Sequence, residues 1–222
     1  MIFDVGANVG DKTNVFLRLG ARVVCIEPDE ANQEILRGKF LRYRLASKPV
    51  AIVGKAASDR STIETMWIDG AGSAVNTLSQ KWAETLKANK DKFEHGHCGL
   101  EFAQRKSVET TTLEDLIPTH GLPFFVKIDV EGYEANVIRG LKHSVPFLSF
   151  EINLPEFRQE GLECVRLLDG LAADGEFNYA TDLQRGMALE KWLGTQEFLS
   201  VVEQYSERYI EVFWRTPLAR GR

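Results

Sequence analysis

FDVGANVG, residues Phe3 to Gly10, decides the fold, because it joins a short apolar stretch to a glycine turn and then to a helical pattern. Gly6 and Gly10 permit a tight turn and a close approach of the backbone to a ligand, and Asn8 tolerates left-handed geometry. A turn after the first strand of an open α/β sheet lies at the edge where such folds bind ligands. The stretch therefore predicts an α/β protein with a candidate ligand site at its first turn. Such a turn also occurs without any ligand.

The residues around this turn alternate between strand and helix patterns. Val23 to Ile26 is a short, continuous apolar run, which is typical of a strand buried on both faces. Expected strands cover residues 2–5, 23–26, 50–53, 124–128, 147–152, 177–180 and 209–215, and expected helices cover residues 11–19, 30–45, 131–141, 162–173 and 191–204. In the helix over 30–45, the residues expected to face the core are Ala31, Ile35, Leu36 and Phe40. The alternation predicts an α/β three-layer sandwich: a Rossmann-like, seven-stranded, mostly parallel sheet with an antiparallel last strand.

Residues 61–112 interrupt this alternation. Thr62 to Ile68 has the pattern of a strand, Gln80 to Phe93 that of a polar helix, and residues 94–99 are rich in Gly and His, as in a loop. We expect one domain over residues 1–222, with this segment inserted between the third and fourth strands of the sheet. An insertion at this place can cover the ligand edge as a lid.

Composition excludes several classes of protein. The 222 residues carry a net charge of −5, with 44% hydrophobic and 27% charged residues, as in ordinary globular domains. No apolar run reaches the length of about 18 residues that a membrane span needs. The first residues lack the pattern of a secretory signal, and Cys25, Cys98 and Cys164 are too far apart for a disulfide framework, so we expect a cytoplasmic protein. The net acidity argues against a nucleic-acid partner.

Glu27 ends the strand pattern VVCIE, about twenty residues after the glycine turn. A carboxylate at this position can accept hydrogen bonds from both hydroxyls of a ribose. Taken alone, it could equally be a solvated acid at a strand end. A dinucleotide fingerprint needs glycine at positions 6, 8 and 11, where this chain has Gly6, Asn8 and Asp11, and an acid at the helix start opposes a pyrophosphate. The two motifs together predict a nucleoside ligand without a pyrophosphate.

The third motif is VKIDVEGYE, residues Val126 to Glu134. Asp129 interrupts an apolar strand where its side chain would face the ligand edge, which favours a functional role. Glu131 and Glu134 follow at a helix start, where acids also serve simply as caps.

These motifs occur together in one known family. FDVGANVG, CIEPD, AASD, TTTLEDL and KIDVEGYEANVIRGL, in this order, resemble the FkbM family of class I S-adenosylmethionine-dependent methyltransferases, over residues 3 to about 153. The resemblance implies that residues of the first motif surround the methionine half of the cofactor. Glu27 would hold the ribose, Ala57, Ser58 and Asp59 would flank the adenine, and Asp129 would lie beside the transferred methyl group. The cofactor-binding residues implied are Asp4, Gly6, Ala7, Asn8, Gly10, Thr13, Glu27, Pro28, Ala57, Ser58 and Asp129.

Methyl transfer to a hydroxyl depends mainly on positioning, and it benefits from a general base or from a metal that acidifies the alcohol. Asp129 and Glu151 are candidate catalytic acids, and His97, with His95, is a candidate base if the loop closes over the cleft. If a divalent metal is used, Asp129, Glu151 and Asn153 are its candidate ligands. We regard this metal site as the less favoured interpretation.

The family resemblance implies O-methylation of a small hydroxyl substrate such as a sugar or a polyketide. Two alternatives remain: a nicotinamide-dependent oxidoreductase, which the turn pattern disfavours, and a non-catalytic nucleoside-binding protein. Class I methyltransferases usually have a helix before the first strand that helps to cover the cofactor. Either the insertion or a second copy of the chain in a homo-oligomer is expected to cover the pocket here.

Overall fold

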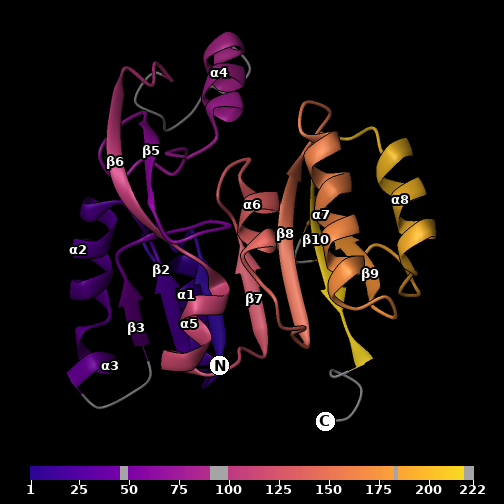
Figure 1. Cartoon of the computed structure of the whole chain (residues 1–222), viewed down its shortest axis with the longest axis horizontal. Coiled ribbons are helices and arrows are strands. Elements are labelled where there is room, and N and C mark those ends of the chain that lie inside the picture. The colour runs from indigo at the N-terminus through magenta and orange to yellow at the C-terminus, as the bar shows by residue number, and fades with distance from the viewer. Residues whose placement is uncertain (46–49, 91–99, 183–184, 218–222) are drawn as a thin grey trace.

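A seven-stranded sheet forms the centre of the computed structural model, which describes residues 1–45, 50–90, 100–182 and 185–217 (Figure 1). Its strands lie in the order β3-β2-β1-β7-β8-β10-β9. They are β1 (Ile2–Val5), β2 (Val23–Ile26), β3 (Val50–Val53), β7 (Phe125–Ile128), β8 (Phe147–Asn153), β9 (Glu176–Ala180) and β10 (Tyr209–Arg215). The pairs from β3 to β8 are parallel, and β10 is antiparallel to both β8 and β9. The predicted α/β fold is confirmed.

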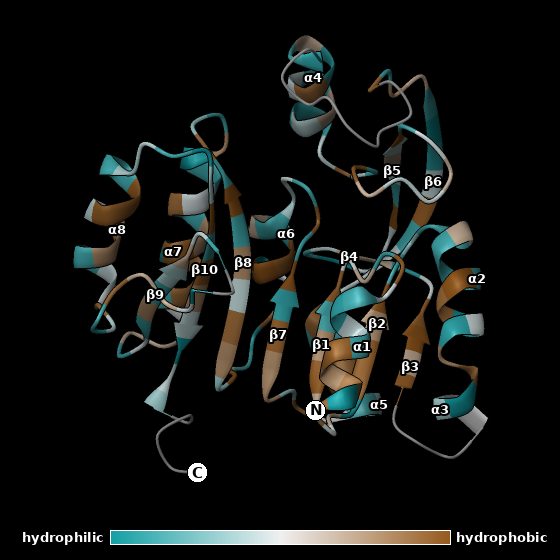
Figure 2. Cartoon of the chain, turned by 180° about the vertical axis from the view of Figure 1, so that it is seen from behind, coloured by the Kyte–Doolittle hydropathy of each residue, from teal (hydrophilic) through white to brown (hydrophobic). Residues whose placement is uncertain are grey.

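Helices cover both faces of this sheet and complete the three layers (Figures 1 and 2). On one face α1 (Asp11–Arg18) and α2 (Glu30–Lys39) pack on β2, with Leu17, Leu36 and Phe40 against Cys25. The apolar residues of the other face pack against α5 (Leu113–His120), α6 (Glu134–Arg139), α7 (Arg158–Leu171) and α8 (Thr195–Gln204). All four residues of β2 are buried, which explains why its sequence is apolar throughout rather than alternating.

The helix expected over residues 30–45 differs from the prediction in two ways. It ends at Lys39, and a short helix, α3 (Leu41–Leu45), follows after Phe40. Leu36 and Phe40 are buried as expected, but Ile35 is 46% exposed and does not face the core. The buried face of α2 instead includes Asn32 and Gln33, whose polar side chains point toward the end of β2.

The insertion, together with the short segment before it, forms a second, smaller sheet beyond the carboxyl ends of the central strands (Figure 1). Its strands lie in the order β4-β6-β5, with β4 (Ala56–Ala57), β5 (Ile63–Ile68) and β6 (Gln104–Thr111), and the helix α4 (Gln80–Ala88) lies beside them. β5 and β6 pair antiparallel over six residues. The sequence did not indicate β6, because most of its residues are polar and exposed.

Candidate functional site

The first glycine turn packs directly against the end of β7. Gly6 has φ +74, and its N–H donates to the Ile26 carbonyl at 3.0 Å. A Cβ at this position would lie 1.8 Å from the Asp129 carbonyl oxygen, so no side chain fits here. The backbone can therefore approach β7 so closely only because residue 6 is glycine.

Glu27 lies at the end of β2 and is 5% exposed. Its Oε2 accepts from the Asn8 N–H at 2.8 Å and its Oε1 from the Asp29 N–H at 2.9 Å. Burial raises the pKa of Glu27 to about 7, although these hydrogen bonds oppose the rise. The glycine turn and the acid of the second motif are thus one structural unit, with a carboxylate held in a fixed orientation.

Asp129 lies at the end of β7 and pairs with a buried lysine. Lys127 is 3% exposed, and its Nζ lies 2.7 Å from Asp129 Oδ2. Burial lowers the pKa of Lys127, but the nearby carboxylates of Asp129 and Asp4 raise it above its usual value overall. The ammonium group therefore stays charged and holds the Asp129 carboxylate in place.

The turn after Asp129 has a left-handed backbone at two successive residues, Glu131 (φ +57) and Gly132 (φ +82). Glu134 Oε1 accepts from the N–H groups of Val130 and Gly132, each at 3.2 Å, so Glu134 caps this turn. Burial raises the pKa of Glu134 to about 7. Glu131, in contrast, contributes to the wall of a cavity.

This cavity lies among the ends of β1, β2 and β7 and contains most of the residues that the motifs predict. Six candidate cofactor residues line it: Gly6, Asn8, Glu27, Pro28, Ala57 and Asp129. Its other polar walls include Asn32, Asn76, Thr77 and Glu131. The cavity is narrow, with a volume of about 50 Å³.

The other candidate cofactor residues lie outside the wall of this cavity. They are Asp4, Ala7, Gly10, Thr13 and Ser58, all buried. Asp4 Oδ2 accepts from Thr13 Oγ1 at 2.5 Å, and Thr13 Oγ1 also lies 3.2 Å from Cys25 Sγ. A Cβ on Gly10 would lie 2.6 Å from Leu36 and Phe40 side-chain atoms. In this conformation Asp4, Ala7, Gly10 and Thr13 join β1, α1 and α2 rather than face the cavity, and Ser58 contacts the second sheet.

The insertion forms one side of the cavity and is hydrogen-bonded to the central domain. Asn76 Nδ2 donates to Asp29 Oδ2 at 2.8 Å, and the Gly72 N–H donates to the same oxygen at 3.1 Å. Thr77 Oγ1 donates to the Glu131 carbonyl at 2.8 Å. Residues 69–77 therefore contact the ends of both β2 and β7 across the cavity.

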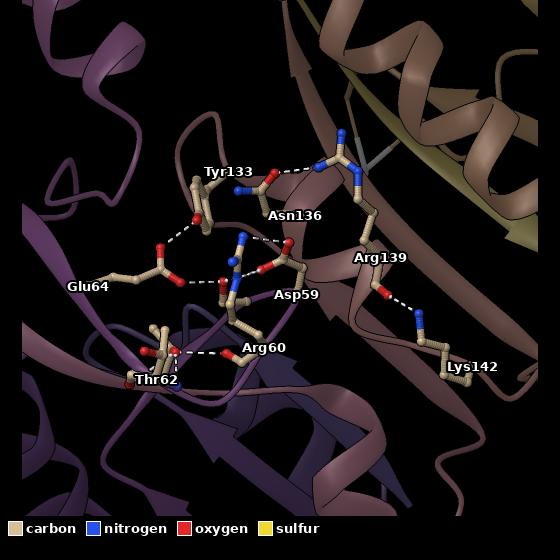
Figure 3. A network of polar contacts seen from close by, with 10 residues as sticks. Asp59, Arg60, Thr62, Glu64, Tyr133, Asn136, Arg139 and Lys142 are labelled. Carbon is tan, nitrogen blue, oxygen red and sulfur yellow. Dashed lines mark hydrogen bonds and ion pairs between the residues drawn. The ribbon is translucent and has the colours of Figure 1, made fainter.

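A second polar network joins the insertion to the turn after β7 (Figure 3). Glu64, on β5, accepts from Tyr133 Oη at 2.6 Å and from Ser58 Oγ at 2.7 Å. Tyr133 belongs to the third motif, and Ser58 follows β4. One carboxylate thus connects the second sheet to two segments that the motifs assign to the cofactor site.

Glu151 and Asn153 lie farther along the same edge of the sheet. Glu151 accepts from Tyr209 Oη at 3.0 Å, and burial, followed by the Asp129 charge, raises its pKa to about 8. Asn153 lines a separate cavity of about 210 Å³ with Trp82, Phe157 and Tyr209. Among the described residues, no three His, Cys, Asp or Glu side chains are grouped to hold a metal ion. His95 and His97 lie outside the described residues.

Sequence reasoning missed four residues around the site: Asn32, Asn76, Thr77 and Lys127. Lys127 stands within the third motif, but a lysine inside a short apolar strand gives no sign of its buried pairing with Asp129. Asn76 and Thr77 lie in a segment without periodicity. For Asn32 a signal existed, because it follows Pro28 by four residues, one helical turn, and so lies on the side of the helix nearest Glu27.

The fold and these residues define a class I methyltransferase: a glycine turn after β1, an acid at the end of β2 and an acid at the end of β7. The chain belongs to the FkbM methyltransferase family, because the family described as "Methyltransferase FkbM domain" matches residues 4–180. The resemblance inferred from the motifs is therefore confirmed.

One solved structure shows the same fold, and two others are less similar. A methyltransferase FkbM from Methylobacillus flagellatus KT is 16% identical with a TM-score of 0.56, and the match covers 97% of this chain and 43% of that one. This chain thus spans less than half the length of that protein. The precorrin-6y C5,15-methyltransferase from Geobacter metallireducens GS-15 is 9% identical (TM-score 0.44; 97% and 79% covered). A SAM-dependent methyltransferase from Agrobacterium tumefaciens is 8% identical (TM-score 0.43; 96% and 55% covered).

Among curated proteins, no sequence matches this chain. Within the part of the chain that the structure describes, no helix combines the length and apolar character needed to cross a membrane.

Proposed function

We propose that this methyltransferase transfers the methyl group of S-adenosylmethionine to a hydroxyl oxygen of a small metabolite, such as a sugar or a polyketide. The observation that carries the proposal is the placement of Glu27, a buried carboxylate fixed by the Asn8 and Asp29 N–H groups at the wall of the cavity. A carboxylate held in this way suits the two hydroxyls of a ribose.

The residues of the cavity fit the cofactor in charge. Glu27, Asp129 and Glu131 line the cavity, and no Lys or Arg among the described residues does so. Acidic side chains ionise more readily beside a cation, so a cavity that they line favours the positively charged sulfonium of this cofactor. Gly6 lets the first turn pack against the Asp129 carbonyl oxygen, with which any side chain would clash. The cofactor would supply an electrophilic methyl group at this place.

In this proposal the chain positions the acceptor and removes its proton. Lys127 holds Asp129 beside the reacting groups, where the Asp129 carboxylate can orient the acceptor hydroxyl as the nucleophile. Glu151, with a pKa raised to about 8 and a hydrogen bond from Tyr209, has the proton affinity that suits a general base near neutral pH. His97 stays a candidate base, and Asp129, Glu151 and Asn153 stay the candidate ligands if a metal takes part.

The insertion acts as the lid of the site in this proposal. The cavity volume of about 50 Å³ is well below the roughly 300 Å³ at which ligand pockets begin, so residues 73–78 must move outward to admit a nucleoside. Their hydrogen bonds to Asp29 and Glu131 can then re-form over the bound cofactor. A homo-oligomer that covers the pocket, a cytoplasmic location and the absence of a nucleic-acid partner belong to the same proposal.

Titration calorimetry with S-adenosylhomocysteine tests the cofactor assignment. We expect the wild-type protein to bind one molecule per chain, and the variants Glu27→Ala and Asp129→Asn to bind at least about tenfold more weakly, because each loses a hydrogen-bonded charge at the wall of the cavity. Glu34→Gln, on the exposed face of α2, is the matched control and should bind normally. No binding by the wild-type protein would contradict the proposal.

The reaction itself needs a second assay, with cofactor labelled on the methyl group and a panel of sugar and polyketide hydroxyls. Transfer to an oxygen supports O-methylation. Cofactor binding without transfer to any acceptor would support the non-catalytic alternative instead.

A further inference from the structure

Asn32 has an unusual position for a polar side chain on a helix. It lies in the first turn of α2, is 1% exposed, and lines the cavity beside Glu27. Its Oδ1 atom is buried and has no hydrogen-bond partner among the residues that the structure describes. A buried carbonyl oxygen without a donor is unfavourable, because it has lost its hydrogen bonds to water. Such an atom at the wall of a ligand cavity requires an explanation.

The orientation of the Asn32 amide follows from its neighbour. Asn32 opposes the rise in the pKa of Glu27 as a hydrogen-bond donor does, which identifies its NH₂ group as the end of the amide that faces Glu27. Oδ1 therefore points away from Glu27. Turning the amide over would place two oxygens against each other and remove this hydrogen bond.

The nearest donors of the insertion are already used. The Gly72 N–H donates to Asp29 Oδ2, and Asn76 Nδ2 donates to Asp29 Oδ2 and to the Gly70 carbonyl. A Cβ on Gly72 would lie 3.1 Å from Asn32 Oδ1, so the glycine keeps the space beside this oxygen open. The closed insertion therefore surrounds Oδ1 without satisfying it.

We infer that Asn32 Oδ1 accepts a hydrogen bond from the nucleoside half of the cofactor, and that Asn32 is a specificity-determining residue for that nucleoside. The inference rests on the proposed function, since it places a nucleoside beside Glu27. The donor is an N–H or O–H group that Glu27 leaves free: either the amino group of the adenine or one ribose hydroxyl that does not donate to Glu27. The hydroxyls lie near the acid that holds the ribose and the amino group lies at the far edge of the base, and each carries the hydrogen that the amide oxygen lacks.

A site with a buried acceptor rejects a ligand that lacks the matching donor, because the acceptor then stays unpaired. Asn32 would therefore do more than add affinity. It would set a preference for the complete nucleoside over analogues of the same shape that lack one donor.

Calorimetry with four ligands tests this inference. They are S-adenosylhomocysteine, an analogue with hydrogen in place of the adenine amino group, and the 2′-deoxy and 3′-deoxy analogues. We expect wild-type protein to bind every analogue that lacks a contacted donor about tenfold or more weakly than the complete ligand, and Asn32→Ala to lose one of these differences while it keeps the others. The analogue whose discrimination disappears identifies the donor as the amino group or as one ribose hydroxyl.

Two controls separate recognition from structure. Gln33→Ala removes the neighbouring buried polar side chain, which donates to the Glu27 and Pro28 carbonyls, and should change all four affinities by one common factor. Circular dichroism and thermal unfolding of Asn32→Ala check that the variant is folded. If Asn32 has only a structural role, Asn32→Ala will change the affinities for all four ligands by one common factor.

The outcomes distinguish this inference from the function on which it rests. Suppose that wild-type protein binds S-adenosylhomocysteine, but the affinity of each analogue relative to S-adenosylhomocysteine is the same in Asn32→Ala as in wild type. The inference is then wrong and the proposed function stands. If wild-type protein does not bind S-adenosylhomocysteine, both are overturned.

Discussion

Gly6 shows how a single residue determines whether the site can form. Its left-handed backbone and the 1.8 Å gap between a hypothetical Cβ and the Asp129 carbonyl are two separate reasons for glycine. The first reason is conformational and the second is steric. A glycine that has only the first reason allows the two effects on stability to be measured separately. Gly20 also has a positive φ, +84, but a Cβ there would meet nothing within 4 Å.

We therefore expect Gly6→Ala to destabilise the protein far more than Gly20→Ala. The Gly20 variant has only backbone strain, about 1 kcal/mol, whereas the Gly6 variant must also separate β1 from β7, which raises the loss to about 3 kcal/mol or more. Urea unfolding of both variants measures the two losses. Equal losses would show that β1 and β7 can move apart without penalty.

The predictability of the site also differs residue by residue. Glu27 and Asp129 were predictable because each interrupts or ends an apolar strand at the ligand edge, and both line the cavity. Asp4 is placed elsewhere because it precedes the end of β1, and alternation turns its side chain toward α1 and Thr13. Asn32 and Glu131 were not assigned to the site. The role of Asn32 depends on which face of α2 is buried, and that of Glu131 depends on a left-handed backbone.

At the scale of elements, the insertion is attached to the central domain mainly through side chains. Glu64 on β5 accepts from Tyr133 and Ser58 (Figure 3). Thr77 donates to the turn after β7. The two sheets share no strand. These hydrogen bonds, together with the packing of Trp82 on Phe157, hold the insertion over the cavity.

We expect Tyr133→Phe to lower the free energy of unfolding by about 1–2 kcal/mol, because it removes one hydrogen bond to a carboxylate. It should also speed the dissociation of S-adenosylhomocysteine in stopped-flow experiments, since the insertion opens more easily. Tyr205→Phe is the matched control, because the Tyr205 hydroxyl makes a longer contact of 3.3 Å with Glu207 in an exposed setting.

A double-mutant cycle of Tyr133→Phe with Glu64→Gln isolates the contact between the two side chains. Additive losses in the cycle would show that the hydrogen bond contributes nothing to holding the insertion.

The sequence predicted the central elements better than the insertion for a physical reason. Strands buried on both faces, such as Val23–Ile26, need apolar residues at every position and are easily recognised. β6 has only one side partly covered, so its polar sequence QRKSVETT resembles a loop. The exposed Ile35 shows the limit within a helix, because an apolar residue at the right spacing is not always buried.

At the scale of the whole molecule, several buried carboxyl groups keep their protons to unusually high pH. Burial is the largest cause in each case, and it raises the pKa of Glu27 and Glu134 to about 7 and that of Glu151 to about 8. The pKa of Glu131 is raised by burial and by the neighbouring acids in the same direction. The folded state therefore binds more protons than the unfolded state between the unfolded pKa near 4.5 and these values.

We expect the free energy of unfolding to fall between pH 6.5 and pH 8, by on the order of 2–3 kcal/mol. The free energy of unfolding falls because a carboxyl group whose pKa is raised in the folded state stabilises the fold at low pH. This contribution is lost as the pH rises through the pKa of the folded state. His120, whose pKa is lowered by burial, acts in the opposite direction but only near and below pH 6.5. Urea unfolding at the two pH values measures the difference.

Glu134→Gln should make this pH dependence shallower, because glutamine still accepts from the Val130 and Gly132 N–H groups but does not titrate. Glu203→Gln, on the exposed face of α8, should leave it unchanged. A stability that rises from pH 6.5 to pH 8 would contradict the assignment of neutral acids to the site.

The position of β10 between β8 and β9 has a consequence for the order of folding during synthesis. β9 is made before β10, yet it pairs with no other strand of the central sheet. While the ribosome is still adding residues 181–208, β9 lacks β10, the strand with which it pairs in the sheet. Its apolar side chains, Phe177 among them, are then incompletely covered. The strands that carry Gly6, Glu27 and Asp129 can pair earlier, because β3, β2, β1, β7 and β8 are all made before β9. The nascent chain can therefore assemble the edge that carries the candidate site while its other edge is still open to aggregation or to chaperones.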